Sequence, residues 1–153
     1  METNLNLKIF LVDDDVFCLN LYRKHLENLG YTEIYSFENG LDCIGRLTEK
    51  PEVIFLDYEM SSLTGTEVLK KIKRFDPDIF VVFLSGQKNI IPAVNALKYG
   101  AFDYIVKDGH QFENMTKVIL KIIQVQELMK HRAPDEFQLK SVFTCYLNIC
   151  AWF

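Results

Sequence analysis

Residues 53–65 read Val-Ile-Phe-Leu-Asp-Tyr-Glu-Met-Ser-Ser-Leu-Thr-Gly. The run at 53–56 is wholly apolar, which is typical of a strand buried on both faces of a parallel sheet, and it ends at the carboxylate of Asp57. Ligands of open parallel sheets bind beyond the carboxyl ends of the strands, where side chains face solvent on a rigid support. Asp57 is therefore the candidate centre of chemistry. The alternative is that Asp57 only caps the segment that follows the strand.

The composition is that of a single globular domain. The chain has 153 residues, of which 49% are hydrophobic and 25% are charged, so it is long enough to bury one core and add a short extra element. The formal net charge is -4 and no basic patch stands out, so we expect no direct nucleic acid binding.

Neither a secretion signal nor a membrane span is expected. Residues 1–7 lack the basic start and apolar run of a signal peptide, and no stretch of about 18 apolar residues is present. We therefore expect a cytoplasmic protein. The four cysteines, Cys18, Cys43, Cys145 and Cys150, show no C-x-x-C spacing, so we expect packing residues rather than a disulfide or a zinc site.

Short apolar runs recur along the chain and are bounded by polar residues, glycine or proline. Buried parallel strands have this pattern. The expected strands are residues 7–12, 34–37, 53–56, 79–84 and 102–106.

Between these runs, apolar residues recur at helical spacing, and Gly30 and Gly100 provide C-terminal stops. The expected helices are residues 16–29, 67–75, 90–99 and 115–129, and a helix after Asn39-Gly40 that carries Leu41, Ile44 and Leu47. Alternating strands and helices predict an α/β fold. We expect a flavodoxin-like, doubly wound five-stranded parallel sheet with strand order 2-1-3-4-5 and helices on both faces.

Polar residues follow four of the predicted strands. Because right-handed crossovers bring the carboxyl ends of parallel strands to one edge of the sheet, we expect these residues to meet. Carboxylate oxygens suit Mg2+ or Mn2+, lysine offers a point charge for phosphate oxygens, and serine offers a hydroxyl donor. Together they predict a phosphoryl site. Its candidate residues are Asp13, Asp14, Asp15, Asp57, Ser85 and Lys107.

Four motifs in order carry a family resemblance: Phe-Leu-Val-Asp-Asp-Asp at 10–15, Phe-Leu-Asp-Tyr-Glu-Met at 55–60 with Leu-Thr-Gly at 63–65, Phe-Leu-Ser-Gly at 83–86, and Gly-Ala-Phe-Asp-Tyr-Ile-Val-Lys at 100–107. The chain resembles the receiver domain of two-component response regulators over residues 7–130. The resemblance implies a signal transduction protein that is phosphorylated but is not itself an enzyme.

The resemblance also implies roles for the acidic residues. Asp57 would accept a phosphoryl group from a histidine kinase or phosphotransfer protein. Asp14 and Asp57 would ligate Mg2+ or Mn2+ directly, with the backbone carbonyl of Glu59 as a third protein ligand and Asp13 reaching the metal through water. Asp15 would cap the following helix.

Ser85 and Lys107 would contact the phosphoryl group, by the same resemblance. Tyr104 falls on the family's aromatic switch position, so Ser85 and Tyr104 would carry the change to the surface formed by the fourth helix, fifth strand and fifth helix. The alternative for Tyr104 is a half-buried core aromatic that never moves. The kinase and the output partner are not identified by the sequence.

Two other functions are open. The run Val-Asp-Asp-Asp-Val-Phe at 12–17 also resembles the D-x-D start of haloacid-dehalogenase-type phosphohydrolases, in which the first Asp is the nucleophile and the second the general acid. That pattern calls for Thr or Val where Phe17 stands, and it gives Asp57 no role. The third candidate is a receiver-like scaffold that is never phosphorylated.

One position departs from the family. Receivers usually carry proline after the lysine, in a cis peptide bond, and this chain has Asp108 there. A cis bond before a residue other than proline costs about 2.5–4 kcal/mol. We therefore predict a trans Lys107–Asp108 bond and a turn reshaped by Asp108 and Gly109. Lys107 would then reach the acidic pocket through its long side chain. We also predict slower phosphotransfer than in receivers with proline at this position.

The C-terminal segment is expected to be distinct from the receiver domain, which we assign to residues 1–132. In the segment 133–153, Ala-Pro-Asp-Glu at 133–136 predicts a hinge, and an apolar stripe predicts a helix that packs on the domain or forms a homodimer. The alternative is the frayed remnant of a missing domain. The chain would then be a piece of a longer protein rather than a stand-alone regulator. The stripe consists of Leu139, Val142, Tyr146, Ile149 and Phe153.

Overall fold

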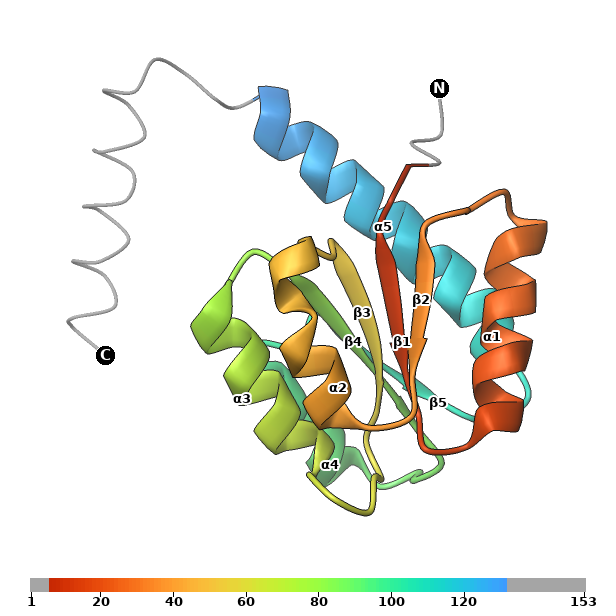
Figure 1. Cartoon of the computed structure of the whole chain (residues 1–153), viewed down its shortest axis with the longest axis vertical. Coiled ribbons are helices and arrows are strands. Elements are labelled where there is room, and N and C mark those ends of the chain that lie inside the picture. The colour runs from red at the N-terminus through yellow and green to blue at the C-terminus, as the bar shows by residue number, and fades with distance from the viewer. Residues whose placement is uncertain (1–5, 132–153) are drawn as a thin grey trace. The chain divides into compact units, whose positions relative to one another are not determined.

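The computed structural model describes residues 6–131. Five parallel strands form one sheet in the order β2-β1-β3-β4-β5, as predicted (Figure 1). The inner strands β1 and β3 come from two of the apolar runs, and both are buried along their whole length. The strands are β1 (Ile9–Val12), β2 (Ile34–Phe37), β3 (Val53–Asp57), β4 (Phe80–Ser85) and β5 (Asp103–Val106).

Helices cover both faces of the sheet, as expected from the alternation of strands and helices. Helices α2, α3 and α4 lie on one face, and α1 and the beginning of α5 lie on the other (Figure 1). The helices are α1 (Val16–Asn28), α2 (Gly40–Gly45), a short 3-10 helix η1 (Leu47–Glu49), α3 (Gly65–Phe75), α4 (Ile90–Lys98) and α5 (Gln111–His131).

The start of α3 brings a helix close to the end of β3. Thr64 and Glu67 form a capping box, in which each side chain accepts a hydrogen bond from the other residue's backbone N–H, so the helix begins two residues before the predicted one. A Cβ at Gly65 would lie 2.7 Å from Phe83 Cε1 and 2.9 Å from the Asp57 carbonyl oxygen. Glycine therefore lets α3 lie directly on the strands that carry the candidate site.

The limits of two other helices also differ from the prediction. The helix expected to carry Leu41, Ile44 and Leu47 ends at Gly45, and Leu47 instead begins η1. Glycine is a poor helix former, and Leu47 reaches the core from the 3-10 turn instead. Helix α5 begins four residues earlier than predicted, because residues 111–114 lack the apolar periodicity on which the prediction relied.

The chain divides into two compact units, residues 1–118 and 119–153. In the first unit, the ring of Phe112 at the start of α5 contacts Tyr22 and His25 of α1. The described part of the second unit is the remainder of α5. The predictions for 133–153, including the apolar stripe and the two C-terminal cysteines, lie outside the described residues. Within 6–131, no helix combines the length and apolarity needed to cross a membrane.

Candidate functional site

The predicted residues meet at one edge of the sheet. Asp13 and Asp14 directly follow β1, Asp57 and Ser85 are the last residues of β3 and β4, and Lys107 directly follows β5. Asp13, Asp57 and Ser85 are buried, whereas Asp14 is exposed. The strand ends therefore hold two carboxylates and a hydroxyl inside the protein and leave one carboxylate open to solvent.

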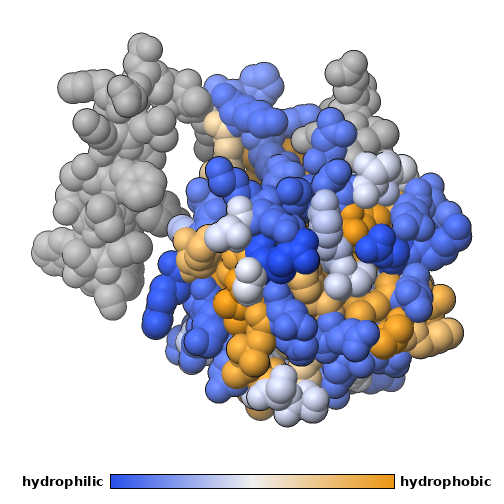
Figure 2. All heavy atoms as spheres, in the orientation of Figure 1, coloured by the Kyte–Doolittle hydropathy of each residue, from blue (hydrophilic) through white to orange (hydrophobic). Residues whose placement is uncertain are grey.

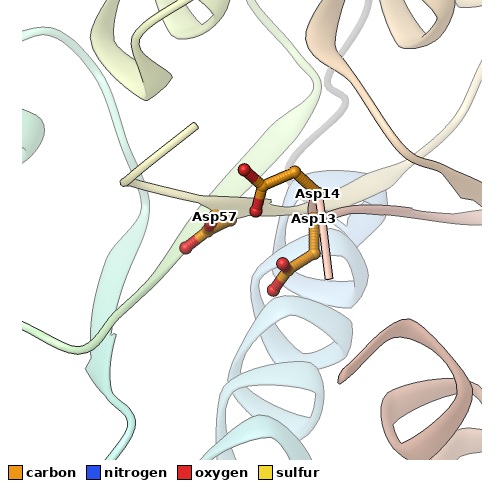
Figure 3. A group of neighbouring side chains, drawn as sticks. All are labelled: Asp13, Asp14 and Asp57. Atoms are coloured by element: carbon orange, nitrogen blue, oxygen red, sulfur yellow. The ribbon is translucent and has the colours of Figure 1, made fainter. Parts of the chain in front are cut away.

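Three of the four acidic candidates form a cluster. One carboxylate oxygen from each of Asp13, Asp14 and Asp57 lies within 4.8 Å of the others, and the side chains lie side by side in Figure 3. Asp15 does not join them, because its side chain accepts the Phe17 N–H and caps α1, as predicted. The second Asp of the phosphohydrolase pattern is therefore used as a helix cap, which gives that alternative no support.

Lys107 joins two of these carboxylates. Its Nζ lies 3.0 Å from Asp13 Oδ2 and 3.1 Å from Asp57 Oδ1. Its backbone N–H donates to the Ser85 carbonyl at 2.7 Å, which fixes the lysine beside the end of β4. One ammonium thus serves two buried carboxylates, and Asp14 adds a third negative charge nearby.

The pKa values reflect this shortage of positive charge. Burial and the charge of Asp13 raise the pKa of Asp57 to about 6, and Lys107 offsets only part of the rise. Burial lowers the pKa of Lys107, but its hydrogen bond to Asp13 and the charge of Asp57 outweigh that effect and leave it raised. Hard oxygen ligands with excess negative charge suit a divalent cation such as Mg2+ or Mn2+.

The turn after Lys107 takes the predicted form. No cis peptide bond occurs among the described residues, so the Lys107–Asp108 bond is trans. Asp108 Oδ1 accepts the His110 N–H at 3.0 Å, and Gly109 adopts a φ of 101°. Lys107 therefore reaches the acidic cluster through its side chain, and a carboxylate shapes the turn where the family has proline.

Ser85 and Tyr104 lie next to the acidic cluster. The Ser85 hydroxyl accepts the Gln87 N–H at 3.0 Å, which orients it at the end of β4. The Tyr104 hydroxyl points inward near Ser85, but it is buried and makes no hydrogen bond to any described residue. Burial raises the pKa of Tyr104.

Two features of the site were not found from the sequence. Tyr58, directly after Asp57, packs its ring against Tyr104, and only its place beside the candidate acceptor could have drawn attention to it. The surface at the first turn of α1, next to the acidic cluster, is apolar, because Val16 and Phe17 are exposed there (Figure 2). The backbone N–H of Glu59 also interacts with Asp57, and this interaction offsets part of the rise in the pKa of Asp57.

Comparisons with known proteins show what this chain is similar to. The chain is 32% identical to the transcriptional regulatory protein CssR of Bacillus subtilis over 130 residues, which cover 85% of this chain and 56% of CssR. It is 34% identical to the chemotaxis protein CheY of Listeria monocytogenes over 104 residues, which cover 66% of this chain and 86% of CheY. The chain thus spans about half the length of CssR.

A solved structure is similar as well. The response regulator protein TrrA of Thermotoga maritima, in complex with Mg2+ and BeF, superimposes with a TM-score of 0.68 at 25% identity, covering 76% of this chain and 98% of TrrA. Residues 9–120 match the sequence model of the response regulator receiver domain. The chain therefore belongs to the response regulator receiver domain family of two-component signal transduction.

Proposed function

We propose that Asp57 accepts a phosphoryl group from a histidine kinase or a phosphotransfer protein in a Mg2+-dependent reaction. One observation carries the proposal: Asp57 is buried at the end of β3, with Lys107 Nζ 3.1 Å from its Oδ1 and the carboxylates of Asp13 and Asp14 alongside. A carboxylate meets an anionic phosphoryl group only where positive charge offsets the repulsion. The site combines the acceptor with one such charge and with ligands for another.

The transfer is a displacement at phosphorus. An Asp57 oxygen forms the new P–O bond, and the P–N bond to the donor histidine breaks with its electron pair passing to the imidazole nitrogen. Lys107 neutralises charge on the transferred oxygens, and Ser85 at the end of β4 supplies a hydroxyl donor. The exposed Val16 and Phe17 give a donor protein an apolar surface beside the acceptor.

The cation has a defined set of candidate ligands. Asp14 and Asp57 would bind Mg2+ or Mn2+ directly, together with the backbone carbonyl of Glu59, and Asp13 would bind it through water. The bound ion supplies positive charge that offsets the negative charge of the phosphoryl oxygens. Three neighbouring carboxylates, of which only Asp13 and Asp57 pair with the Lys107 ammonium, support this assignment, and so does the Mg2+ in the TrrA structure.

Signalling follows from the environment of the acceptor. Phosphorylation adds charge and acceptor oxygens beside Ser85, and Ser85 and Tyr104 pass the change to a docking surface for an output partner. The chain itself acts as a phosphoacceptor rather than an enzyme. A cytoplasmic location rests on the family assignment, and the net charge of -4 argues against direct nucleic acid binding. Homodimer formation through residues 133–153 remains part of the proposal.

The test is phosphorylation by acetyl phosphate in the presence of Mg2+, followed by intact mass measurement. Wild type should gain one phosphoryl group, and chelation of Mg2+ should prevent the gain. Asp78→Asn removes an exposed carboxylate from the loop before β4, at the opposite end of the sheet, and should label like wild type. If wild type does not label, the chain is the receiver-like scaffold instead.

A further inference from the structure

We propose that Tyr58 is a positioning residue that, together with Phe83, holds the Tyr104 ring turned inward before any phosphoryl group is present. The proposal rests on the proposed function only in treating Tyr104 as the switch. The three rings form one contact group. The Tyr58 centroid lies 5.4 Å from that of Phe83 and 5.9 Å from that of Tyr104, and the Phe83 and Tyr104 centroids are 6.3 Å apart.

Strand pairing places the three rings on the same face of the sheet. Phe83 of β4 pairs with Tyr104 of β5 and, on its other side, with Leu56 of β3. Tyr58 follows Leu56 by two residues, so its side chain points to the same face, and its backbone N–H still donates to Leu84 at 2.9 Å. The backbone therefore delivers Tyr58 to the Tyr104 ring.

Phe83 is the most deeply buried ring of the three. Its side chain is fully buried, and the first residue of α3, Gly65, lies so close that a Cβ there would approach Phe83 Cε1 to 2.7 Å. The Tyr58 ring meets Phe83 at 75° and Tyr104 at 65°, both edge-to-face arrangements, which are favourable for aromatic pairs. Tyr104 thus has a fully buried ring on one side and a half-buried ring on another.

The Tyr104 hydroxyl gains little from pointing inward, because Ser85 lies near enough to lower the pKa of Tyr104 but makes no hydrogen bond to it. It is buried and has no hydrogen-bond partner among residues 6–131, whereas water would satisfy it if the ring turned outward. The aromatic contacts must therefore supply the preference for the inward orientation. Phe83 is locked in the core, so Tyr58 is the contact that a substitution can remove without opening the sheet.

This arrangement presets the switch. The Tyr104 hydroxyl lies buried near Ser85, and we expect the ring to keep this position in the unphosphorylated protein, whereas a moving aromatic switch would fill that space only after phosphorylation. The acyl phosphate mimic formed with Mg2+ and BeF should therefore change the surroundings of the Tyr104 ring little in wild type. Without the Tyr58 ring, Tyr104 should start outward and move inward when the mimic forms.

The experiment is 19F NMR of the full chain labelled with 3-fluorotyrosine, with the Tyr104 resonance assigned from Tyr104→Phe. The readout is the change in chemical shift between H2O and D2O, which reports solvent contact of the ring. Tyr58→Phe keeps the ring and should leave Tyr104 protected, as in wild type. Tyr58→Leu keeps an apolar side chain and should expose Tyr104, and Mg2+ with BeF should restore its protection. Tyr58→Met serves the same purpose if Tyr58→Leu does not fold.

Two results separate this proposal from the proposed function. If Tyr104 stays protected in a folded Tyr58→Leu or Tyr58→Met variant, Tyr58 does not position it. The same conclusion holds if Tyr104 is solvent-exposed in wild type. Failure of wild type to label with acetyl phosphate would overturn the role of Asp57 but not the role of Tyr58, because the ring orientation is measured without a phosphoryl group.

Discussion

Lys107 Nζ lies 3.1 Å from Asp57 Oδ1, although Asp57 ends β3 and Lys107 follows β5, two strands that are not neighbours in the sheet. β4 lies between β3 and β5, so the contact forms only when all three strands are paired. The Lys107 side chain then reaches past the end of β4, where the Lys107 backbone N–H donates to the Ser85 carbonyl. The ion pair at the candidate acceptor Asp57 therefore depends on the correct pairing of β3, β4 and β5.

Lys107→Met should slow phosphorylation by acetyl phosphate by about a hundredfold, because it removes a preorganised charge from the transferring group. It should also lower the free energy of unfolding by about 1–3 kcal/mol, since it leaves the buried Asp13 and Asp57 carboxylates without their hydrogen-bond donor. Initial rates by intact mass and urea denaturation measure the two effects.

Lys107→Arg is the matched control for this substitution. It keeps the charge but replaces a compact ammonium by a planar guanidinium, so it should recover part of the stability and less of the rate. A Lys107→Met variant that labels at the wild-type rate would show that the lysine plays no part in the transfer.

Stability without metal should depend on pH through Asp57. The folded state holds this carboxyl protonated up to about pH 6, whereas the unfolded chain releases the proton near pH ~4. The folded state therefore binds more protons in this window, and the free energy of unfolding contributed by Asp57 falls as pH rises through it.

Asp57→Asn removes this dependence. In EDTA at pH 7 it should be more stable than wild type by about 2–3 kcal/mol, and the difference should shrink towards zero at about pH 4. Added Mg2+ should stabilise wild type more than the variant. Urea titrations at several pH values measure these differences, and a difference independent of pH would contradict the raised pKa of Asp57.

Tyr104→Phe removes a buried hydroxyl that has no hydrogen-bond partner among the described residues. The free energy of unfolding should therefore stay the same or rise by up to about 1 kcal/mol. Tyr35→Phe is the contrasting control, because the Tyr35 hydroxyl donates to Glu33 at 3.0 Å on the surface. A clear loss of stability in Tyr104→Phe would mean that the hydroxyl is satisfied in solution.

The strands and the acidic cluster could be predicted from the sequence for one physical reason. Strands buried on both faces must be apolar throughout, so the first polar residue after each run marks the edge of the sheet. Asp57, Ser85 and Lys107 stand at such positions and meet as predicted. The capping role that the family resemblance implied for Asp15 is confirmed as well, and its place directly before α1 suits a cap.

Contacts between side chains on the same face were harder to predict. Nothing in the sequence around Tyr58 shows that its ring meets Tyr104, because that contact depends on the pairing of β3, β4 and β5 together. The limits of α2 and α5 were missed because a glycine and a polar first turn interrupt the apolar period. Hydrophobic spacing alone therefore does not locate these two helix ends.

Asp108→Pro should speed phosphorylation by acetyl phosphate. Proline restores the residue that the family carries after the lysine, and it removes a negative charge close to the phosphoryl site. The variant also loses the Asp108 hydrogen bond to the His110 N–H, so a small loss of stability should accompany the gain in rate. Asp108→Ala separates the two causes, because it removes the charge without proline. A rate no faster than wild type in Asp108→Pro would contradict this explanation.

The central claim is that Asp57 is the phosphoacceptor. Its most direct test is to phosphorylate wild type and Asp57→Asn side by side with acetyl phosphate and Mg2+, measure intact mass, and locate the modified residue by peptide mapping after borohydride reduction. We expect one phosphoryl group on wild type, located at Asp57, and none on a folded Asp57→Asn. Equal labelling of the two proteins, or a modification mapped to Asp13 or Asp14, would contradict the account.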